Sequence, residues 1–356
     1  MIRSFGVEEE LLLVSSDGRP APAADRVVDL APRDLETEFK KEQTEFGSDP
    51  CSDTGELEGQ LRSLRATASA AAGSAGARVV ALATSPLKVR PTVTDDERYR
   101  RMTEEFGLLA DQLLTCGQHV HVQIRSPEEG VAVLDRIGVW LPTILAVSAN
   151  SPFWQGQDTG YASFRSMLWG RWPTAVSTAP FGDPTTYDAV RAELISSGAA
   201  LDDAMIYFDA RLSVKYPTLE IRVPDVCLDV SDAVLIAALC RGLVDTSAEA
   251  WRRGDPAPAV RPELMRAAQW RAARRGLTDQ LVDLADRRPI PAAAALDRLL
   301  AHVQGALTTN GDLDCVQEGL RRLLNAGTGA QRQRGAYRAR GTLSDVVDDA
   351  VARTLM

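Results

Sequence analysis

Two glutamates near the start of the chain have the type and spacing to bind a metal ion. They are Glu8 and Glu10 of FGVEEELLLV, residues 5–14, a segment that predicts a β-strand. Alternate side chains of a strand share a face, so Glu8 and Glu10 point together and Glu9 points the other way. On an inward face their like charges require a cation, and carboxylate oxygens are ligands that suit Mg²⁺ and Mn²⁺. A solvated strand edge would give the same pattern.

Two of the three histidines of the chain lie two residues apart. His119 and His121 belong to QHVHV, whose alternation predicts a strand with both rings on one face. Neutral imidazole is a common ligand of transition metals, and its ring nitrogens also hydrogen-bond to phosphate oxygens. The pair is therefore a candidate for a metal or phosphate site. Core histidines with satisfied hydrogen bonds are the alternative that this segment leaves open.

A carboxylate and a guanidinium share one face of a third predicted strand. In LEIRV, residues 219–223, Glu220 and Arg222 alternate with apolar residues. The planar fork of arginine matches phosphate and carboxylate oxygens, whereas glutamate binds a metal ion or pairs with a cation. An ion pair at the protein surface is the competing interpretation.

The three segments together indicate more than each one does alone. Each places a pair of polar side chains on one face of a separate strand, as the floor of a cleft formed by a sheet requires. Two further pairs give weaker signals, namely Glu38 with Glu45, seven residues apart, and Arg165 with Arg171 in a Trp-rich segment. Solvated surface side chains would explain either of these pairs equally well.

Helices are among the elements that must position these side chains. Apolar residues at helical spacing predict helices over about residues 53–72 and 95–114. Ser126 and Glu129 predict a capping box at the start of another helix, with Pro127 in its first turn. Beyond about residue 230 the chain becomes rich in Ala, Leu and Arg, which predicts a helical C-terminal third.

Further strands complete the predicted sheet. Residues 78–84 form an apolar run that predicts a buried strand, and the runs 206–214 and 218–223 predict a β-hairpin. Residues 151–184 contain several Trp, Gly and Pro residues but little periodicity. This predicts a long loop, and loops of this length tend to bind ligands or close over them.

We therefore expect an α+β fold, with strands separated by helices through residue 225 and helices thereafter. A length of 356 residues allows one large domain or two unequal ones. Residues 1–230 would form a catalytic sheet-and-helix region. Residues 231–356 would form a helical region that packs on it and contributes to the same domain.

Composition restricts the class of protein. Hydrophobic residues make up 45% and charged residues 25% of the chain, as in soluble globular proteins. The net charge of −9 argues against nucleic acid as a partner. Five scattered cysteines without a CxxC pair predict reduced thiols. Because no uninterrupted apolar run reaches about 18 residues and no signal-peptide segment precedes the first glutamates, we expect no membrane partner and a cytoplasmic location.

Longer segments of the chain resemble a known family, the type 2 glutamate-cysteine ligases, which include carboxylate-amine ligases of the YbdK type. The resemblance rests on GVEEELLLV, EQTEFGSDPCSD, CGQHVHVQI, YASFRSMLWGRWPTA, DARLSVKYPTLEIRVPDVC, WRAARRGL and GTGAQRQR. These segments run from residue 5 to about residue 335 in the order of the family. The blocks at 161–175 and 209–227 are highly specific.

The resemblance implies a glutamine-synthetase-like fold, in which a curved, mainly antiparallel sheet flanked by helices forms one wall of a funnel for ATP, divalent metal ions and an amino-acid substrate. It assigns metal binding to five residues: Glu8, Glu10, Glu45, His119 and Glu220. It assigns catalysis to Glu8, Glu220 and Arg222, with Arg222 contacting the transferred phosphoryl group. It assigns substrate or nucleotide binding to His121, Arg165, Arg171 and Arg271.

The reaction that the resemblance implies is ATP-dependent formation of an amide, a γ-glutamyl bond in the family's case, through an acyl phosphate. The implied cofactors are ATP and Mg²⁺ or Mn²⁺. The implied partners are a small carboxylic acid and an amine, and a second copy of the chain in a homodimer. Metal-bound glutamates and Arg222 would neutralise charge during phosphoryl transfer, which depends mainly on positioning and electrostatics.

The chain departs from the usual pattern of the family at a few positions. Gln118 and Gln123 stand where relatives have an aliphatic residue and a glycine, and Thr44 stands within the usual QVE. Residues 176–178, Val-Ser-Thr, follow WPTA in place of a glycine and prolines. These changes bear on the choice of substrate, above all of the amine.

Two other functions stay open at this stage. One is metal-dependent hydrolysis of an amide or a phosphate ester, against which the absence of an HExxH motif argues. The other is a nucleotide-binding relative that has lost the reaction, against which the retention of every charged position named above argues.

Overall fold

The computed structural model describes residues 2–356, and Met1 lies outside the described residues. Within that range the fold centres on a seven-stranded sheet in the order β2-β3-β1-β5-β9-β8, with β4 paired to the end of β1. Every pair of neighbouring strands in it is antiparallel. The strands are β1 (Phe5–Val14), β2 (Glu36–Thr37), β3 (Gln43–Gly47), β4 (Arg78–Val80), β5 (Gln118–Gln123), β8 (Ala210–Leu212) and β9 (Thr218–Ile221). The mainly antiparallel sheet of the predicted α+β fold is confirmed.

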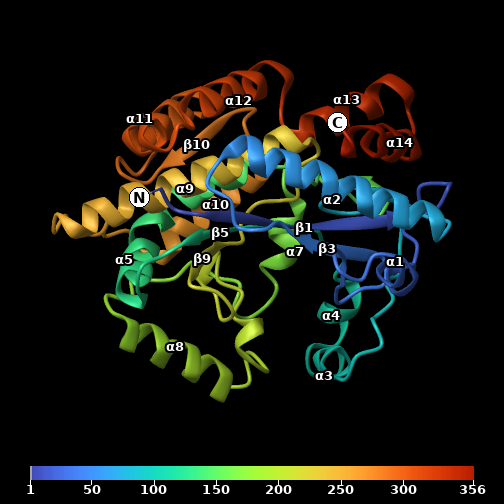
Figure 1. Ribbon diagram of the computed structural model, residues 1–356, viewed down its shortest axis with the longest axis horizontal. Coiled ribbons are helices and arrows are strands. Elements are labelled where there is room, and N and C mark those ends of the chain that lie inside the picture. The colour runs from blue at the N-terminus through green and yellow to red at the C-terminus, as the bar shows by residue number, and fades with distance from the viewer. Residues whose placement is uncertain (1) are drawn as a thin grey trace.

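Helices cover the sheet from both sides (Figure 1). The helices before residue 230 are α1 (Ala24–Leu30), α2 (Thr54–Ser74), α3 (Glu97–Phe106), α4 (Leu108–Gln112), α5 (Pro127–Ile137), α6 (Leu141–Ser148), α7 (Phe164–Trp169) and α8 (Pro184–Ser196), with 3-10 turns η1 (Gly138–Trp140) and η2 (Asp203–Met205). In Figure 1, α2 lies on one side of β1, and α3, α4 and α8 lie on the other.

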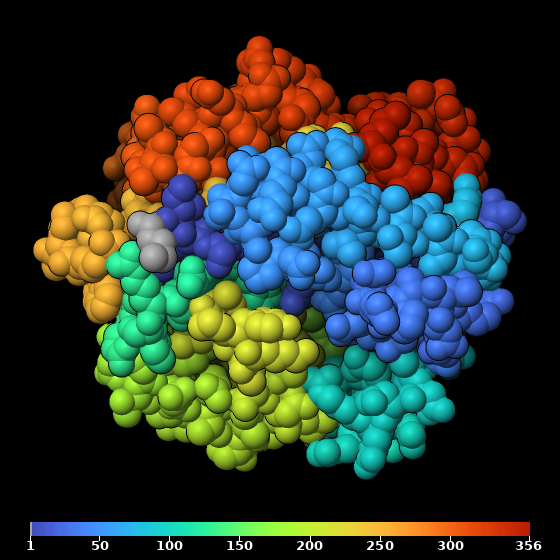
Figure 2. Space-filling view, viewed as in Figure 1, coloured from blue at the N-terminus to red at the C-terminus, as the bar shows by residue number. Residues whose placement is uncertain are grey.

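The last third of the chain is helical, as predicted. Its helices are α9 (Val230–Arg252), α10 (Pro262–Arg275), α11 (Ala292–Asn310), α12 (Leu313–Ala326), α13 (Gly329–Arg340) and α14 (Leu343–Thr354). Helix α9 is buried along most of its length and contacts α2, β1 and β5, while α11 and α12 pack on α9. Figure 2 shows the orange and red C-terminal helices directly beside the blue surface of α2. The division into residues 1–230 and 231–356 stays a prediction.

Two hairpins lie outside the main sheet. They are formed by β6 (Phe153–Trp154) with β7 (Gln157–Asp158), and by β10 (Gln280–Asp283) with β11 (Arg288–Pro291). The first hairpin and α7 lie in the segment 151–184 that we expect to be a loop, so this segment is more ordered than its lack of periodicity indicates.

The α2-facing side of β1 contains a buried charge that the protein neutralises itself. Glu9 and Arg65 of α2 are both 0% exposed and form two hydrogen bonds, of 2.8 and 2.6 Å. The remaining donors of Arg65 reach the backbone oxygens of Cys227, Leu228 and Thr354, at 2.7 to 3.2 Å. This guanidinium therefore ties β1, α2, the segment just before α9 and the end of the chain together.

Three predicted elements differ in detail. The helix expected over 95–114 is wrong as a single element, because Gly107 adopts φ +53 and separates α3 from α4. The strand expected over 78–84 ends at Val80. The capping box at α5 is half formed: Ser126 accepts the N–H of Glu129, but the Glu129 carboxylate accepts from Arg3 and from the N–H of Arg125.

One apolar stretch passes a length and composition test for membrane helices. Residues Pro127–Ser148, which span α5 to α6, have a window of mean hydropathy 1.6 that is 72% buried inside the structure. Asp135 and Arg136 interrupt this stretch, so it does not contradict the expectation that no uninterrupted apolar run reaches about 18 residues. Core helices of soluble proteins pass the same test, and α6 packs against α9 and α10.

Breaking the buried ion pair should destabilise the protein strongly. We expect Arg65→Ala to lower the free energy of unfolding by about 3–5 kcal/mol, because Glu9 is left charged and buried without a partner. Arg62 of the same helix pairs with Glu58 while 43% exposed, so Arg62→Ala should cost about 1 kcal/mol or less. Denaturant titration measures both values. Equal losses in the two variants would contradict this role of Arg65.

Candidate functional site

Four of the predicted metal ligands meet on the face of the sheet opposite to Glu9. The register places Glu10 of β1 directly across from Glu45 of β3, and Glu8 directly across from His119 of β5. Ligand atoms of Glu10, Glu45 and His119 lie within 4.8 Å of one another. Directly opposed like charges destabilise an antiparallel pair. This part of the sheet is therefore poorly stabilised by the protein's own charges.

The predicted pair on β9 joins the same row of side chains. Glu220 lies across from His121 of β5 on one side and from Arg211 of β8 on the other. Arg211 donates to the Glu220 carboxylate at 2.7 Å, and Arg222 forms a second ion pair with it. Ligand atoms of Glu8, His119 and Glu220 also lie within 4.8 Å of one another. We call Glu8, Glu10, Glu45, His119 and Glu220 the acidic row.

Two buried carboxyl groups of the acidic row, Glu10 and Glu45, have too little positive charge around them to stay ionised. Burial, together with the charge of the nearby Glu38 carboxylate, raises the pKa of Glu10 to about 7. Burial raises the pKa of Glu45 well above its usual value, and the charges of Glu38 and Glu8 add to that effect. Without a cation these carboxyl groups tend to hold a proton. A divalent cation would supply the missing charge and keep them ionised.

The other two carboxylates of the acidic row stay ionised. Burial raises the pKa of Glu8, but hydrogen bonds from His119 and His121 outweigh burial and hold it below its ordinary value. Burial likewise raises the pKa of Glu220, but the charges of Arg222 and Arg211 outweigh it and lower the pKa. Glu8 and Glu220 are therefore anionic and can bind a cation. They lie next to Glu10 and Glu45, whose charge the protein does not balance.

His119 is in the protonation state that a metal ligand needs. Burial lowers its pKa to about 4, and the charge of Arg222 contributes, so the ring is neutral near pH 7. Its Nδ1 lies 3.4 Å from Glu8 and 4.0 Å from Glu220. Its Nε2 is buried and finds no hydrogen-bond partner among residues 2–356. A ring that donates from Nδ1 to Glu8 leaves the lone pair on Nε2 available for a cation.

The donor set fits Mg²⁺ or Mn²⁺. It consists of carboxylate oxygens with one neutral imidazole shared by two groups of three residues, Glu8–His119–Glu220 and Glu10–Glu45–His119. Hard oxygen ligands suit both ions, and the imidazole favours Mn²⁺ more than Mg²⁺. Buried ligand atoms without partners, such as Nε2 of His119, are consistent with this assignment in the described part of the chain.

Two arginines lie beside the acidic row and share one aromatic ring. The guanidinium carbons of Arg165 and Arg222 lie 5.7 and 6.0 Å from the ring centroid of Trp169 in α7. Arg165 is buried, donates to the backbone oxygens of Val223 and Arg222, and lies 3.9 Å from Asp225. Cations stacked on an aromatic face keep their N–H donors in a defined plane. These two side chains are thus held ready to contact an anion.

Gly117 makes room for Arg165. A Cβ at this position would lie 2.2 Å from Nη2 of Arg165, so any other residue would displace the guanidinium. The N–H of Gly117 also donates to the Glu10 carboxylate at 2.5 Å. One glycine therefore fixes both a carboxylate of the acidic row and the neighbouring arginine.

A family model matches almost the whole chain. The glutamate-cysteine ligase family 2 (GCS2) model matches residues 4–349. The chain belongs to glutamate-cysteine ligase family 2. A protein of Frankia alni provisionally named glutamate–cysteine ligase 2-2 is 49% identical over 99% of this chain and 97% of its own length. One of Paenarthrobacter aurescens, provisionally named glutamate–cysteine ligase 2-1, is 48% identical over 99% and 95%.

Solved structures share the fold. The crystal structure of a glutamate–cysteine ligase from Francisella tularensis in complex with AMP aligns with a TM-score of 0.72 at 14% sequence identity. The alignment covers 100% of this chain and 89% of that chain. This likeness confirms the predicted glutamine-synthetase-like fold, and the family assignment confirms the resemblance seen in the sequence.

Two of the predicted binding residues lie away from the acidic row. Arg171 is exposed, lies 3.4 Å from Gln112 and faces the ring of Trp154. Arg271 of α10 donates to the backbone oxygen of Gln280 and lies 3.5 Å from Asp279. In this structure neither side chain faces the carboxylates, so their roles in binding stay predictions.

Sequence reasoning missed three residues of the site and weighted a fourth too low. Arg211 was missed, although aligning the two strands of the predicted hairpin places it across from Glu220. Gly117 and Trp169 were missed because only the folded chain shows what they contact. Glu38 gave only a weak signal with Glu45, yet its charge raises the pKa of two members of the acidic row.

We expect the protein to bind Mn²⁺ at the acidic row. Glu45→Gln should weaken Mn²⁺ binding by about 10-fold or more, because a ligand is lost. Glu105 of α3 is exposed and lies outside the acidic row, so Glu105→Gln is the matched control and should leave the affinity unchanged. Electron paramagnetic resonance of free Mn²⁺ measures the binding. Wild-type affinity in Glu45→Gln would remove Glu45 from the site.

Proposed function

We propose that this protein is an ATP-dependent carboxylate-amine ligase that forms an amide bond, a γ-glutamyl bond when the acid is glutamate. The observation that carries the proposal is the acidic row beside Arg222 on one face of the sheet, in a chain of glutamate-cysteine ligase family 2. Glutamate and cysteine are the substrate pair in the names of the relatives, and glutamate is the acid that we propose first.

The proposed reaction has two steps. An oxygen of the substrate carboxylate attacks the γ-phosphorus of ATP, the bond to the β,γ-bridging oxygen breaks, and ADP leaves. The amine nitrogen then attacks the carbonyl carbon of the resulting acyl phosphate, loses a proton, and inorganic phosphate leaves with the bonding electron pair. Both steps move negative charge among phosphoryl oxygens, so catalysis rests on positioned cations and donors.

The acidic row would hold the divalent cation that neutralises the phosphates of ATP. We propose Mg²⁺ or Mn²⁺, bound by Glu8, Glu10, Glu45, His119 and Glu220. Arg222 is buried, and although burial lowers its pKa, the charges of Glu220 and Glu10 outweigh burial and raise it, so it stays a cation. A permanent cation next to the metal ligands can stabilise the negative charge of the phosphoryl group during its transfer. Glu8, Glu220 and Arg222 are the catalytic residues of this proposal.

Arg165 would hold the substrate carboxylate or the phosphate formed from it. Its Nε finds no hydrogen-bond partner among residues 2–356, although the side chain is buried. An unsatisfied buried guanidinium donor is costly, and an anionic substrate would satisfy it. His121, whose Nε2 lies 3.3 Å from Glu8, would contact a phosphate. Arg171 and Arg271, which contact Gln112 and Gln280, are further candidates for binding the substrate or the nucleotide.

Other parts of the proposal concern the whole protein. Its partners are small molecules, a carboxylic acid and an amine, together with a second copy of the chain in a homodimer. Its location is the cytoplasm. The chain departs from the family pattern at residues 176–178, where Ser177 lies 3.3 Å from Asp209. Because this departure bears on the choice of amine, a substrate screen should first identify the amine.

Loss of an acidic-row carboxylate should stop turnover. We expect Glu8→Ala and Glu220→Ala each to lower phosphate release from ATP by about 1000-fold, which corresponds to about 4 kcal/mol of transition-state stabilisation lost with the metal. Glu105→Ala should keep full activity. The assay is phosphate release with Mg²⁺ across panels of carboxylic acids and amines, with glutamate tested first.

Three outcomes of the same assay would contradict the proposal. Wild-type rates in both alanine variants would remove these glutamates from catalysis. Product formation without ATP would favour a metal-dependent hydrolase. Metal-dependent ATP binding with no turnover on any pair of substrates would favour a nucleotide-binding protein that has lost the reaction.

A further inference from the structure

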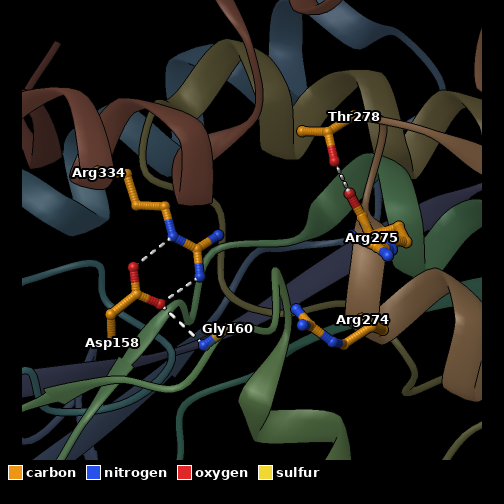
Figure 3. Close-up of a pocket in the computed structure, with 6 residues that line it drawn as sticks. All are labelled: Asp158, Gly160, Arg274, Arg275, Thr278 and Arg334. Carbon is orange, nitrogen blue, oxygen red and sulfur yellow. Dashed lines mark hydrogen bonds and ion pairs between the residues drawn. The ribbon is translucent and has the colours of Figure 1, made fainter.

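A polar cavity of about 340 Å³ lies where hairpin β6–β7, helix α10 and helix α13 meet (Figure 3). Its lining residues are Asp158, Gly160, Arg274, Arg275, Thr278 and Arg334. None of them belongs to the acidic row or has a role in the proposed reaction. Two of the segments that identify the family, WRAARRGL and GTGAQRQR, supply its three arginines.

Arg274 is the least compensated charge of this cavity. Within residues 2–356 its guanidinium forms no ion pair and no hydrogen bond, and it lies 5.2 Å from the ring centroid of Tyr161. Gly160 adopts φ +74, and a Cβ there would lie 3.1 Å from Nη1 of Arg274. The glycine therefore leaves the guanidinium at the cavity wall with its N–H donors free for a ligand.

Arg334 reaches the cavity from the opposite side and is held in place. Its Nε and Nη2 donate to the Asp158 carboxylate at 2.8 and 2.6 Å, and Nη2 also donates to the backbone oxygen of Tyr161 at 2.9 Å. These bonds leave Nη1 without a partner in the described chain. A fixed guanidinium with spare donors binds an oxyanion at little cost in side-chain entropy.

The charges around the cavity favour a dianion. The lining residues comprise three arginines and one aspartate, which gives +2. Asp279 lies 3.5 Å from both Arg275 and Arg271, so the addition of Asp279 and Arg271 leaves the balance at +2. The whole chain carries −9, so this is a local positive region on an acidic protein. A phosphate group carries about −1.5 to −2 at neutral pH and matches it better than one carboxylate.

We propose that this cavity is a second anion site, which binds a phosphate group, either free or as part of a small metabolite. Its volume is near the lower end of the range of about 300–1000 Å³ that is typical of small-molecule sites, so the ligand is small. The carboxylates of the acidic row repel a phosphate in the absence of a metal, whereas the lining of this cavity carries net positive charge without one. The proposal is therefore independent of the proposed ligase activity.

The test is calorimetric titration of the full chain with inorganic phosphate in EDTA at constant ionic strength. We expect a dissociation constant of about 1 mM or lower. Arg274→Gln should weaken binding by about 10-fold or more, because charge-assisted hydrogen bonds are lost. Arg266 of the same helix is exposed and is not a lining residue, so Arg266→Gln is the matched control. Thermal unfolding of both variants shows whether the fold is retained.

Two further titrations distinguish the sources of the anion. Glutarate presents two carboxylates without phosphorus, and ATP without metal presents phosphate on a nucleotide. Phosphate or ATP binding that Arg274→Gln weakens and Arg266→Gln leaves intact supports the proposal, and the tighter of the two identifies the source. Binding of neither phosphate nor ATP, equal weakening by both variants, or glutarate binding tighter than both phosphate and ATP would overturn it.

Discussion

Repulsion between buried carboxylates is the constraint on which the rest of this structure depends. The antiparallel register places Glu10 directly against Glu45 in the sheet, with Glu8 two residues away on the same face. Burial raises the pKa of Glu10 and Glu45, and the charge of Glu38 raises both as well, so the surrounding protein does not balance these two carboxylates. The face is consistent with a site completed by cations, and the proposed function follows from what those cations can bind.

Both faces of β1 carry glutamate side chains, and the charge of these glutamates is balanced differently on the two faces. On one face the protein supplies its own counter-charge, because Arg65 surrounds Glu9 with hydrogen bonds and ties four segments together. On the other face neither Glu10 nor Glu45 forms a salt bridge within residues 2–356, and Arg222 and Arg211 pair with Glu220. Strand β1 thus carries a structural ion pair on one face and a candidate functional site on the other.

Much of the site could be predicted because alternation along a strand fixes the face of each side chain. Glu8 with Glu10 and Glu220 with Arg222 share a face in the structure as expected. Which strands pair, and in which register, depends on contacts between distant parts of the chain, so the pairing of Glu10 with Glu45 was not foreseeable. Side chains outside regular strands, such as Arg171, gave no periodic signal from which their direction could be read.

Anomalous diffraction from crystals grown with Mn²⁺ tests the central claim most directly. We expect a manganese peak at about 2.0–2.2 Å from carboxylate oxygens of the acidic row, with Nε2 of His119 among the ligands. Crystals that bind Mn²⁺ only elsewhere, with the carboxylates still in contact with one another, would show that the acidic row is stable without metal and would contradict the account.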